Sequence, residues 1–149
     1  MSSSKYRHLL DEAHRAMKLA HAPYSGFRVG AAALVDSGDI VVGCNIENAA
    51  YSPSICAERV ALFSSWAQGK GKVEAIAIVT ASGATAAPCG VCRQVLWELA
   101  RDAELILEDG KGGYLIETVR NLLPRPFGPE DLDVSKLPPR QGADGRQPS

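Results

Sequence analysis

The sequence predicts a three-layer α/β/α fold, in which helices cover both faces of a mixed, five-stranded sheet. Segments with strand periodicity alternate with segments of helical periodicity through the middle of the chain, which is typical of this architecture. The chain has 149 residues, of which 46% are hydrophobic and 22% are charged. A chain of this length buries about 70% of the surface that it exposes when unfolded, which is enough for a core without disulfides. We therefore expect a single domain over residues 1–137.

An amphipathic helix over residues 5–21 is the first expected element. Apolar side chains recur there at spacings of three and four, and Pro23 ends the pattern. Two runs rich in valine and alanine follow at 27–35 and 40–46, and the small polar residues 36–39 between them favour a tight turn. These two runs are therefore expected to pair as antiparallel strands.

The middle of the chain supplies two helices with a strand between them. A helical pattern over 56–68 ends at Gly69, and the continuous apolar run 73–80 is typical of a strand buried on both faces. A second amphipathic helix begins near Gly90. Strand and helix thus alternate, as a layered α/β domain requires.

The last part of the chain is expected to complete the sheet and then lose regular structure. Short strands over 104–108 and 114–118 flank a glycine-rich turn, and a short helix is expected within 116–123. Six of the nine prolines lie from Pro124 onward, where apolar residues are few. We therefore expect residues 138–149 to form a disordered tail.

The charge balance argues against nucleic-acid and membrane partners. Lysine and arginine number 16 against 17 aspartates and glutamates, so no large field attracts phosphate backbones or anionic lipids. No apolar run has the length of a signal peptide or a membrane span. The expected location is therefore the cytoplasm.

Cysteine placement is the strongest chemical signal. In a reducing cytosol the four cysteines, Cys44, Cys56, Cys89 and Cys92, are expected to be metal ligands, catalytic thiols or small buried residues. Cys56 opens one expected helix, and Cys89 and Cys92 open the next. The partial positive charge of a helix start lowers a thiol pKa, and the thiolate is the form that binds zinc.

Three cysteine ligands leave the fourth tetrahedral position of a zinc ion open for water, as in catalytic zinc sites. Glu58 follows Cys56 by two residues, so its side chain can reach such a water as a proton carrier. Three thiolates give the zinc site a formal charge of about −1, and the adjacent Arg59 can offset it by hydrogen bonding to sulfur. The pattern thus predicts one zinc ion per subunit with Glu58 as its base.

Two other interpretations of the cysteines stay open on spacing alone. A C-G-x-C motif at a helix start also resembles the redox dithiol of thioredoxin-like proteins, although this leaves Cys56 and Glu58 without a role. Alternatively, Cys44 is the fourth ligand of a closed structural zinc site. Strand alternation argues against that, because Cys44 should face away from Asn45 and Glu47.

Five segments, in order, resemble the small homo-oligomeric cytidine deaminases over nearly the whole chain. They are Ala22-Pro23-Tyr24-Ser25 with Phe27 and residues 29–32, the segment 43–52, Cys56-Ala57-Glu58-Arg59, residues 88–94, and Leu122-Leu123-Pro124 with Phe127. A His or Cys ligand, a nearby Glu and P-C-x-x-C are the known signature of zinc nucleobase deaminases.

This resemblance implies a homotetramer that hydrolyses cytidine and deoxycytidine to uridine, deoxyuridine and ammonia in pyrimidine salvage. Cys56, Cys89 and Cys92 would hold the zinc ion. Glu58 would carry protons from the bound water to ring nitrogen N3 and then to the departing amino group.

The resemblance also implies the substrate contacts. Asn45 and Glu47 would hydrogen-bond the ribose 3′-hydroxyl, and strand alternation would place both on one face. Phe27 would pack beside the pyrimidine, and the backbone of Ala57 would hydrogen-bond the base.

Two aromatic residues would connect the pocket to the assembly. Phe127 would reach from a neighbouring subunit to stack on the base, and Tyr51 lies in a patch that the family also uses across subunits. The competing functions are an aminonucleoside deaminase of blasticidin S type, a polynucleotide deaminase and a zinc-stabilised binding module. Polynucleotide deaminases usually carry His in place of Cys56 and need a basic track, and neither is evident here.

Overall fold

The computed structural model describes residues 3–85 and 87–132 and contains one five-stranded sheet. The elements are α1 (Ser3–Met17), β1 (Val29–Val35), β2 (Ile40–Cys44), α2 (Ala57–Ala67), β3 (Val73–Thr80), α3 (Gly90–Leu99), β4 (Glu104–Glu108), β5 (Tyr114–Thr118), α4 (Val119–Leu122) and a 3₁₀ turn (Pro129–Asp131). Strand order is β2-β1-β3-β4-β5. Only the β3–β4 pair is parallel, so the predicted mixed sheet is confirmed. The expected tail, residues 138–149, lies outside the described residues.

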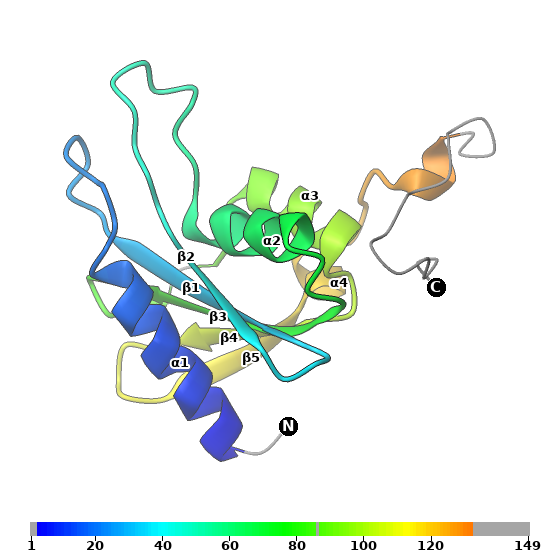
Figure 1. Cartoon of the computed structure of the whole chain (residues 1–149), viewed down its shortest axis with the longest axis horizontal. Coiled ribbons are helices and arrows are strands. Elements are labelled where there is room, and N and C mark those ends of the chain that lie inside the picture. The colour runs from blue at the N-terminus through cyan, green and yellow to red at the C-terminus, as the bar shows by residue number, and fades with distance from the viewer. Residues whose placement is uncertain (1–2, 86, 133–149) are drawn as a thin grey trace.

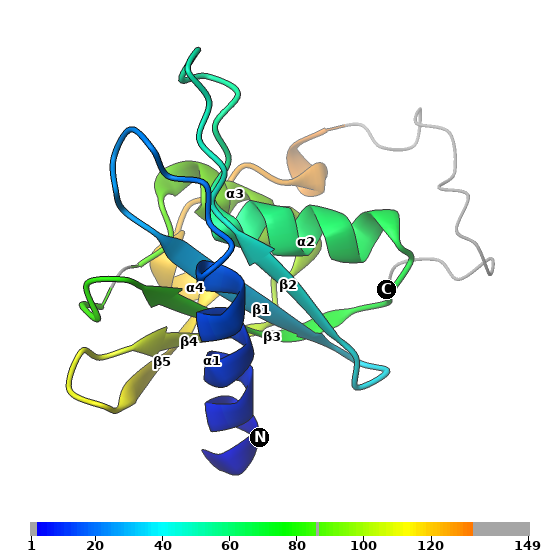
Figure 2. The same cartoon turned by 60° about the vertical axis from the view of Figure 1, so that its left-hand side comes forward.

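Helices cover the two faces of the sheet unequally. α1 packs on one face, and α2, α3 and α4 pack on the other (Figure 1, Figure 2). Because side chains alternate along a strand, β1 supplies Ala31 and Ala33 to the α2–α3 face and Ala32 and Leu34 to the α1 face. Each face therefore has its own apolar cluster, and the three-layer prediction is confirmed.

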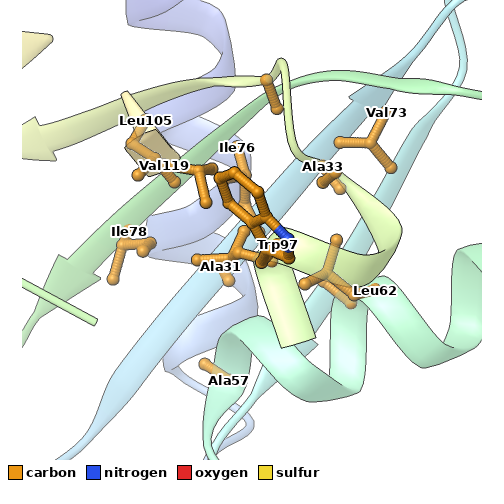
Figure 3. Packing of buried hydrophobic residues seen from close by; sticks show 14 of the residues in the cluster. Ala31, Ala33, Ala57, Leu62, Val73, Ile76, Ile78, Trp97, Leu105 and Val119 are labelled. Carbon is orange, nitrogen blue, oxygen red and sulfur yellow. The ribbon is translucent and has the colours of Figure 1, made fainter. Parts of the chain in front are cut away.

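The larger cluster is organised around Trp97 of α3. Figure 3 shows its ring among side chains of α2, the sheet and α4, including Leu62, Ile76 and Val119. All of these side chains are buried. Burying large apolar groups stabilises the fold by about 2 kcal/mol per side chain, so this cluster fixes α3 against α2 and the sheet.

Two glycines let helices approach the sheet closely. A Cβ atom at Gly43 in β2 would overlap the carbonyl oxygen of Ala57 and would lie 2.5 Å from the backbone nitrogen of Ala61. On the opposite face, a Cβ atom at Gly30 would overlap the carbonyl oxygen of Ala13 in α1. The absence of a side chain at Gly43 therefore sets how close the start of α2 lies to the sheet.

Tertiary hydrogen bonds shorten three elements relative to the sequence prediction. α1 ends at Met17, not at His21, because the backbone N–H of His21 donates to the carbonyl of Asn45 (3.0 Å). β1 begins at Val29, not at Phe27, because the Asn45 side chain hydrogen-bonds the Phe27 carbonyl and the Val29 N–H. β2 ends at Cys44, so the expectation of strand through residue 46 is wrong.

The last strand of the sheet leads directly into α4. β5 continues to Thr118, whose hydroxyl caps α4 by accepting from the Asn121 N–H at 3.2 Å. The short helix is therefore confined to the last part of the range 116–123. Within residues 3–85 and 87–132, no helix combines the length and apolar character that crossing a membrane requires.

Replacing Gly43 with alanine should destabilise the fold. The added Cβ meets backbone atoms of α2 that cannot move independently, so we expect the free energy of unfolding to fall by about 2 kcal/mol. Urea denaturation measures this. Gly90→Ala is the matched control, because a Cβ there has no neighbour within 4 Å. Equal midpoints for Gly43→Ala and the wild type would contradict the close approach.

Candidate metal centre and active site

The strand topology brings three connecting segments to one end of the sheet. β1 is antiparallel to both of its neighbours, so Val29 at its start pairs with Thr80 at the end of β3, and Gly30 pairs with Cys44 at the end of β2. The segment before β1 and the segment after β2 project together from this end (Figure 1, Figure 2). The helices that follow β2 and β3 therefore both begin here.

Three cysteine sulfurs meet where α2 and α3 begin. Cys56 is the N-cap of α2, and Cys89 is the N-cap of α3. Cys56 Sγ lies 3.8 Å from Cys89 Sγ, and Cys89 Sγ lies 3.4 Å from Cys92 Sγ; all three sulfurs are within 4.8 Å of one another. Sulfurs around tetrahedral zinc, each about 2.3 Å from the metal, are about 3.8 Å apart. The cluster therefore fits one zinc ion.

The cluster is open on one side. Cys92 is buried, Cys56 is half-buried and Cys89 is exposed, so the solvent side remains available for a fourth ligand. Among the described residues, the group of converging ligand atoms contains these three cysteines and not Cys44. The closed four-cysteine site therefore finds no support.

The thiols share their protons unequally. A hydrogen bond from Cys92, together with the guanidinium of Arg59, lowers the pKa of Cys56 to about 5. The same hydrogen bond to Cys56, with burial, raises the pKa of Cys92 above its ordinary value. Arg59 Nη2 lies 3.6 Å from Cys56 Sγ and donates to it. Cys56 is therefore a thiolate at neutral pH, the form that binds zinc.

Glu58 lies in the first turn of α2 beside this cluster. Its side chain is buried, with the residue only 4% exposed, and burial raises its pKa above the ordinary value. The negative charge of Cys56 raises it further. A buried carboxyl with a raised pKa, next to a candidate metal site, is suited to accept and release protons.

Asn45 and Glu47 come from the connection that follows β2. Asn45 Oδ1 accepts a hydrogen bond from the Val29 N–H, and its Nδ2 donates to the Phe27 carbonyl, both at 2.8 Å. Each polar end of the amide keeps capacity for one further hydrogen bond. The side chain of Asn45 therefore ties the start of β1 to this end of the sheet.

Glu47 is held by the segment before β1. Its Oε1 accepts from the Tyr24 and Ser25 N–H groups at 3.0 and 3.1 Å, and its Oε2 accepts from Ser25 Oγ at 2.5 Å. These bonds, that of the Ser25 hydroxyl above all, lower the pKa of Glu47. Glu47 is therefore ionised at neutral pH and can only accept hydrogen bonds.

A hollow of about 310 Å³ lies at Glu47. Its lining is Tyr24, Ser25, Glu47, Tyr51 and Ser54. The sequence reasoning gave no role to Ser25 or Ser54. The spacing of Ser25 and Phe27 could have predicted a role for Ser25, because a serine hydroxyl commonly accepts a hydrogen bond from the backbone N–H two residues later. That bond is present here, at 3.0 Å.

The aromatic candidates are exposed. Tyr51 is 75% exposed and adopts a φ of 58°, in the left-handed region that residues other than glycine rarely adopt. Phe127 is 57% exposed, and its carbonyl accepts from Gln94 Nε2 of α3 at 2.6 Å. Phe27 is 46% exposed. The isolated chain thus leaves all three rings accessible to other molecules.

Comparisons with known proteins agree with this geometry. A family model described as the cytidine and deoxycytidylate deaminase zinc-binding region matches residues 3–107. The chain belongs to this family. The expected zinc cofactor is thereby confirmed as a property of the family, and the cysteine cluster can hold one ion. The redox-dithiol interpretation does not account for this membership.

Curated relatives and solved structures are similar over most of the chain. A cytidine deaminase from Halalkalibacterium halodurans is 44% identical over 126 residues, which cover 84% of this chain and 96% of the relative. One from Sporosarcina psychrophila is 43% identical over 128 residues, which cover 85% and 94%. The crystal structure of a cytidine deaminase from Burkholderia pseudomallei gives a TM-score of 0.78 at 41% identity, with 85% of this chain and all of that one covered.

The zinc content of cysteine variants should distinguish the three clustered cysteines, which are expected to bind the metal, from Cys44, which is not. We expect one zinc ion per chain in the wild type and in Cys44→Ala, and less than about a tenth of that in Cys89→Ala, because an open site with two thiolates binds zinc weakly. Elemental analysis of the purified proteins measures this. Loss of zinc from Cys44→Ala to the same extent would contradict the assignment.

Proposed function

We propose that the protein catalyses the zinc-dependent hydrolytic deamination of cytidine and deoxycytidine to uridine and deoxyuridine, with release of ammonia. The observation that carries this proposal is the three-cysteine cluster at two helix starts with the buried Glu58 beside it. The relatives at 43–44% identity are named cytidine deaminases, which supports the substrate. The role would be pyrimidine salvage in the cytoplasm, on free nucleosides and not on nucleic acid.

The proton transfers belong to Glu58. Cys56, Cys89 and Cys92 would hold the zinc ion, which would supply a Lewis acid to acidify the attacking water. Glu58 takes the proton from that water and delivers it to N3 of the pyrimidine, and the water oxygen attacks C4. Glu58 then carries the proton of the hydroxyl group now on C4 to the amino group, which leaves as ammonia as the C4–N bond breaks and the C4 carbonyl forms. The burial that raises the pKa of Glu58 suits both transfers.

The substrate would bind between the cluster and the hollow at Glu47. Asn45 and Glu47 would hydrogen-bond the ribose 3′-hydroxyl, and the ionised Glu47 is suited to accept from it. Phe27 would lie beside the pyrimidine ring. The backbone of Ala57, the first residue of α2, would hydrogen-bond the base.

The assembly would be a homotetramer whose pockets are shared between subunits. Large apolar side chains are exposed on α2 and on the edge strand β2, namely Phe63, Trp66 and Val42. Exposed apolar surface of this kind is typical of protein interfaces. The exposed Tyr51 and Phe127 would enter the pockets of neighbouring copies.

Replacing Glu58 should abolish turnover without removing zinc. We expect Glu58→Gln to lower kcat for cytidine by about a thousandfold or more, because a glutamine amide cannot take the proton from the water. Loss of the ultraviolet absorbance of cytidine measures the rate, and chromatography confirms uridine. Glu98→Gln, the same change at an exposed position of α3, is the control. No conversion by the zinc-loaded wild type would overturn the proposal, and blasticidin S would be the next substrate to test.

Mixed oligomers test the shared pocket. We expect Glu58→Ala and Phe127→Ala each to be impaired alone. Coexpression should restore activity at about a quarter of the sites, because an intact Glu58 can then meet an intact Phe127 from another chain. Activity no greater than that of the two variants assayed separately would show that Phe127 does not act across subunits.

A further inference from the structure

We infer that Ser25 is a positioning residue for nucleoside binding: its hydroxyl joins the Glu47 carboxylate to the backbone of Phe27 and so sets the sugar contact relative to the base contact. The inference rests on the proposed function, in which Glu47 binds the ribose and Phe27 lies beside the pyrimidine. Ser25 belongs to the segment before β1, outside the metal cluster.

The direction of the hydrogen bonds follows from the chemistry of the groups. Glu47 is ionised and can only accept, so the Ser25 hydroxyl must donate its single hydrogen to Glu47 Oε2. The lone pairs of Ser25 Oγ then accept from the Phe27 N–H at 3.0 Å. The Ser25 hydroxyl thus links the two residues, and both hydrogen bonds donate in the same direction, from the Phe27 N–H to Ser25 and from Ser25 to Glu47.

The count of acceptor positions shows where a substrate hydroxyl can bind. A carboxylate offers about four lone-pair positions, two on each oxygen. Glu47 Oε1 already accepts from the Tyr24 and Ser25 N–H groups, whereas Oε2 accepts only from Ser25 Oγ. The remaining position is therefore on Oε2, so a ribose hydroxyl and the Ser25 hydroxyl bind the same oxygen.

The Phe27 backbone is held from both sides. Its N–H donates to Ser25 Oγ, and its carbonyl accepts from Asn45 Nδ2 at 2.8 Å. The Asn45 side chain makes no hydrogen bond to the Ser25 hydroxyl, so removal of that hydroxyl should leave the start of β1 unchanged. Ser25 is exposed, and hydrogen bonds that compete with water add little to folding stability. Removal of the hydroxyl should therefore weaken binding and leave the fold intact.

The test compares Ser25→Ala with a matched serine. Ser37 lies in the turn between β1 and β2, and its Oγ accepts from the Asp39 N–H two residues later, as Ser25 Oγ does from the Phe27 N–H, so Ser37→Ala removes the same atom away from the hollow. Ser25→Thr restores a hydroxyl. The zinc-loaded enzymes are assayed for kcat and KM with cytidine and with 3′-deoxycytidine, and zinc content and Tm are measured for each.

We expect Ser25→Ala to raise KM for cytidine about tenfold with kcat within about twofold, as the loss of one charge-assisted hydrogen bond would. Ser25→Thr should recover most of this loss, and Ser37→Ala should have a KM within about twofold of the wild type. With 3′-deoxycytidine, which lacks the partner of Glu47, the effect of Ser25→Ala on KM should fall below about twofold. Zinc content and Tm should match the wild type.

Several results would overturn the inference. An unchanged KM for cytidine in Ser25→Ala, an equal loss with both nucleosides, or an equal loss in Ser37→Ala would each do so. Absence of turnover by the wild type would overturn the proposed function and this inference with it. Turnover by the wild type with an unchanged KM in Ser25→Ala would overturn the inference alone.

Discussion

The site depends on one constraint, the meeting of two helix N-termini at a single edge of the sheet. Because β1 lies antiparallel between β2 and β3, the ends of those two strands are neighbours, and the helices that follow them start side by side. The first N–H groups of each helix and its dipole then stabilise negative charge at the same point. Cys56 and Cys89 occupy the N-cap positions of these helices, but their side chains make no capping hydrogen bond to the helix backbone. Gly43 supports this arrangement, since it allows α2 to begin close to β2.

The same convergence concentrates negative charge in a buried place. Three thiols lie within 4.8 Å of one another, and Glu58 is buried beside them. Arg59 contributes one positive charge, which the Cys56 thiolate already engages. The hydrogen bond between Cys92 and Cys56 lowers the pKa of Cys56 and raises that of Cys92, and burial raises the pKa of Glu58. A divalent cation allows all three sulfurs to ionise together, so metal binding and the protonation state of Glu58 are physically linked.

The sequence was sufficient to predict those parts of the fold and the site that depend on interactions between residues close together in the chain. Periodicity predicts the five strands, and the spacing of Cys56, Cys89 and Cys92 predicts which thiols cluster, because each motif lies within one helical turn. It failed at the ends of α1, β1 and β2, where hydrogen bonds to the side chain and backbone of Asn45 replace those of regular structure. No local pattern contains those contacts, since their partners are 16 to 24 residues away along the chain. The link from Ser25 to Glu47 went unnoticed for the same reason.

The two halves of the site are built with different rigidity. The metal half lies on two helices packed by buried side chains such as Leu62 and Trp97, so its geometry is fixed by the core. The half proposed to bind the sugar lies on two loops joined by hydrogen bonds at exposed residues, which water can replace at little cost. Excluding water from those bonds strengthens them, because their electrostatic energy rises as the local dielectric constant falls. In the proposed tetramer, a neighbouring copy that covers Tyr51 would supply this exclusion. Assembly would then order the nucleoside-binding loops, while the zinc site forms within each chain.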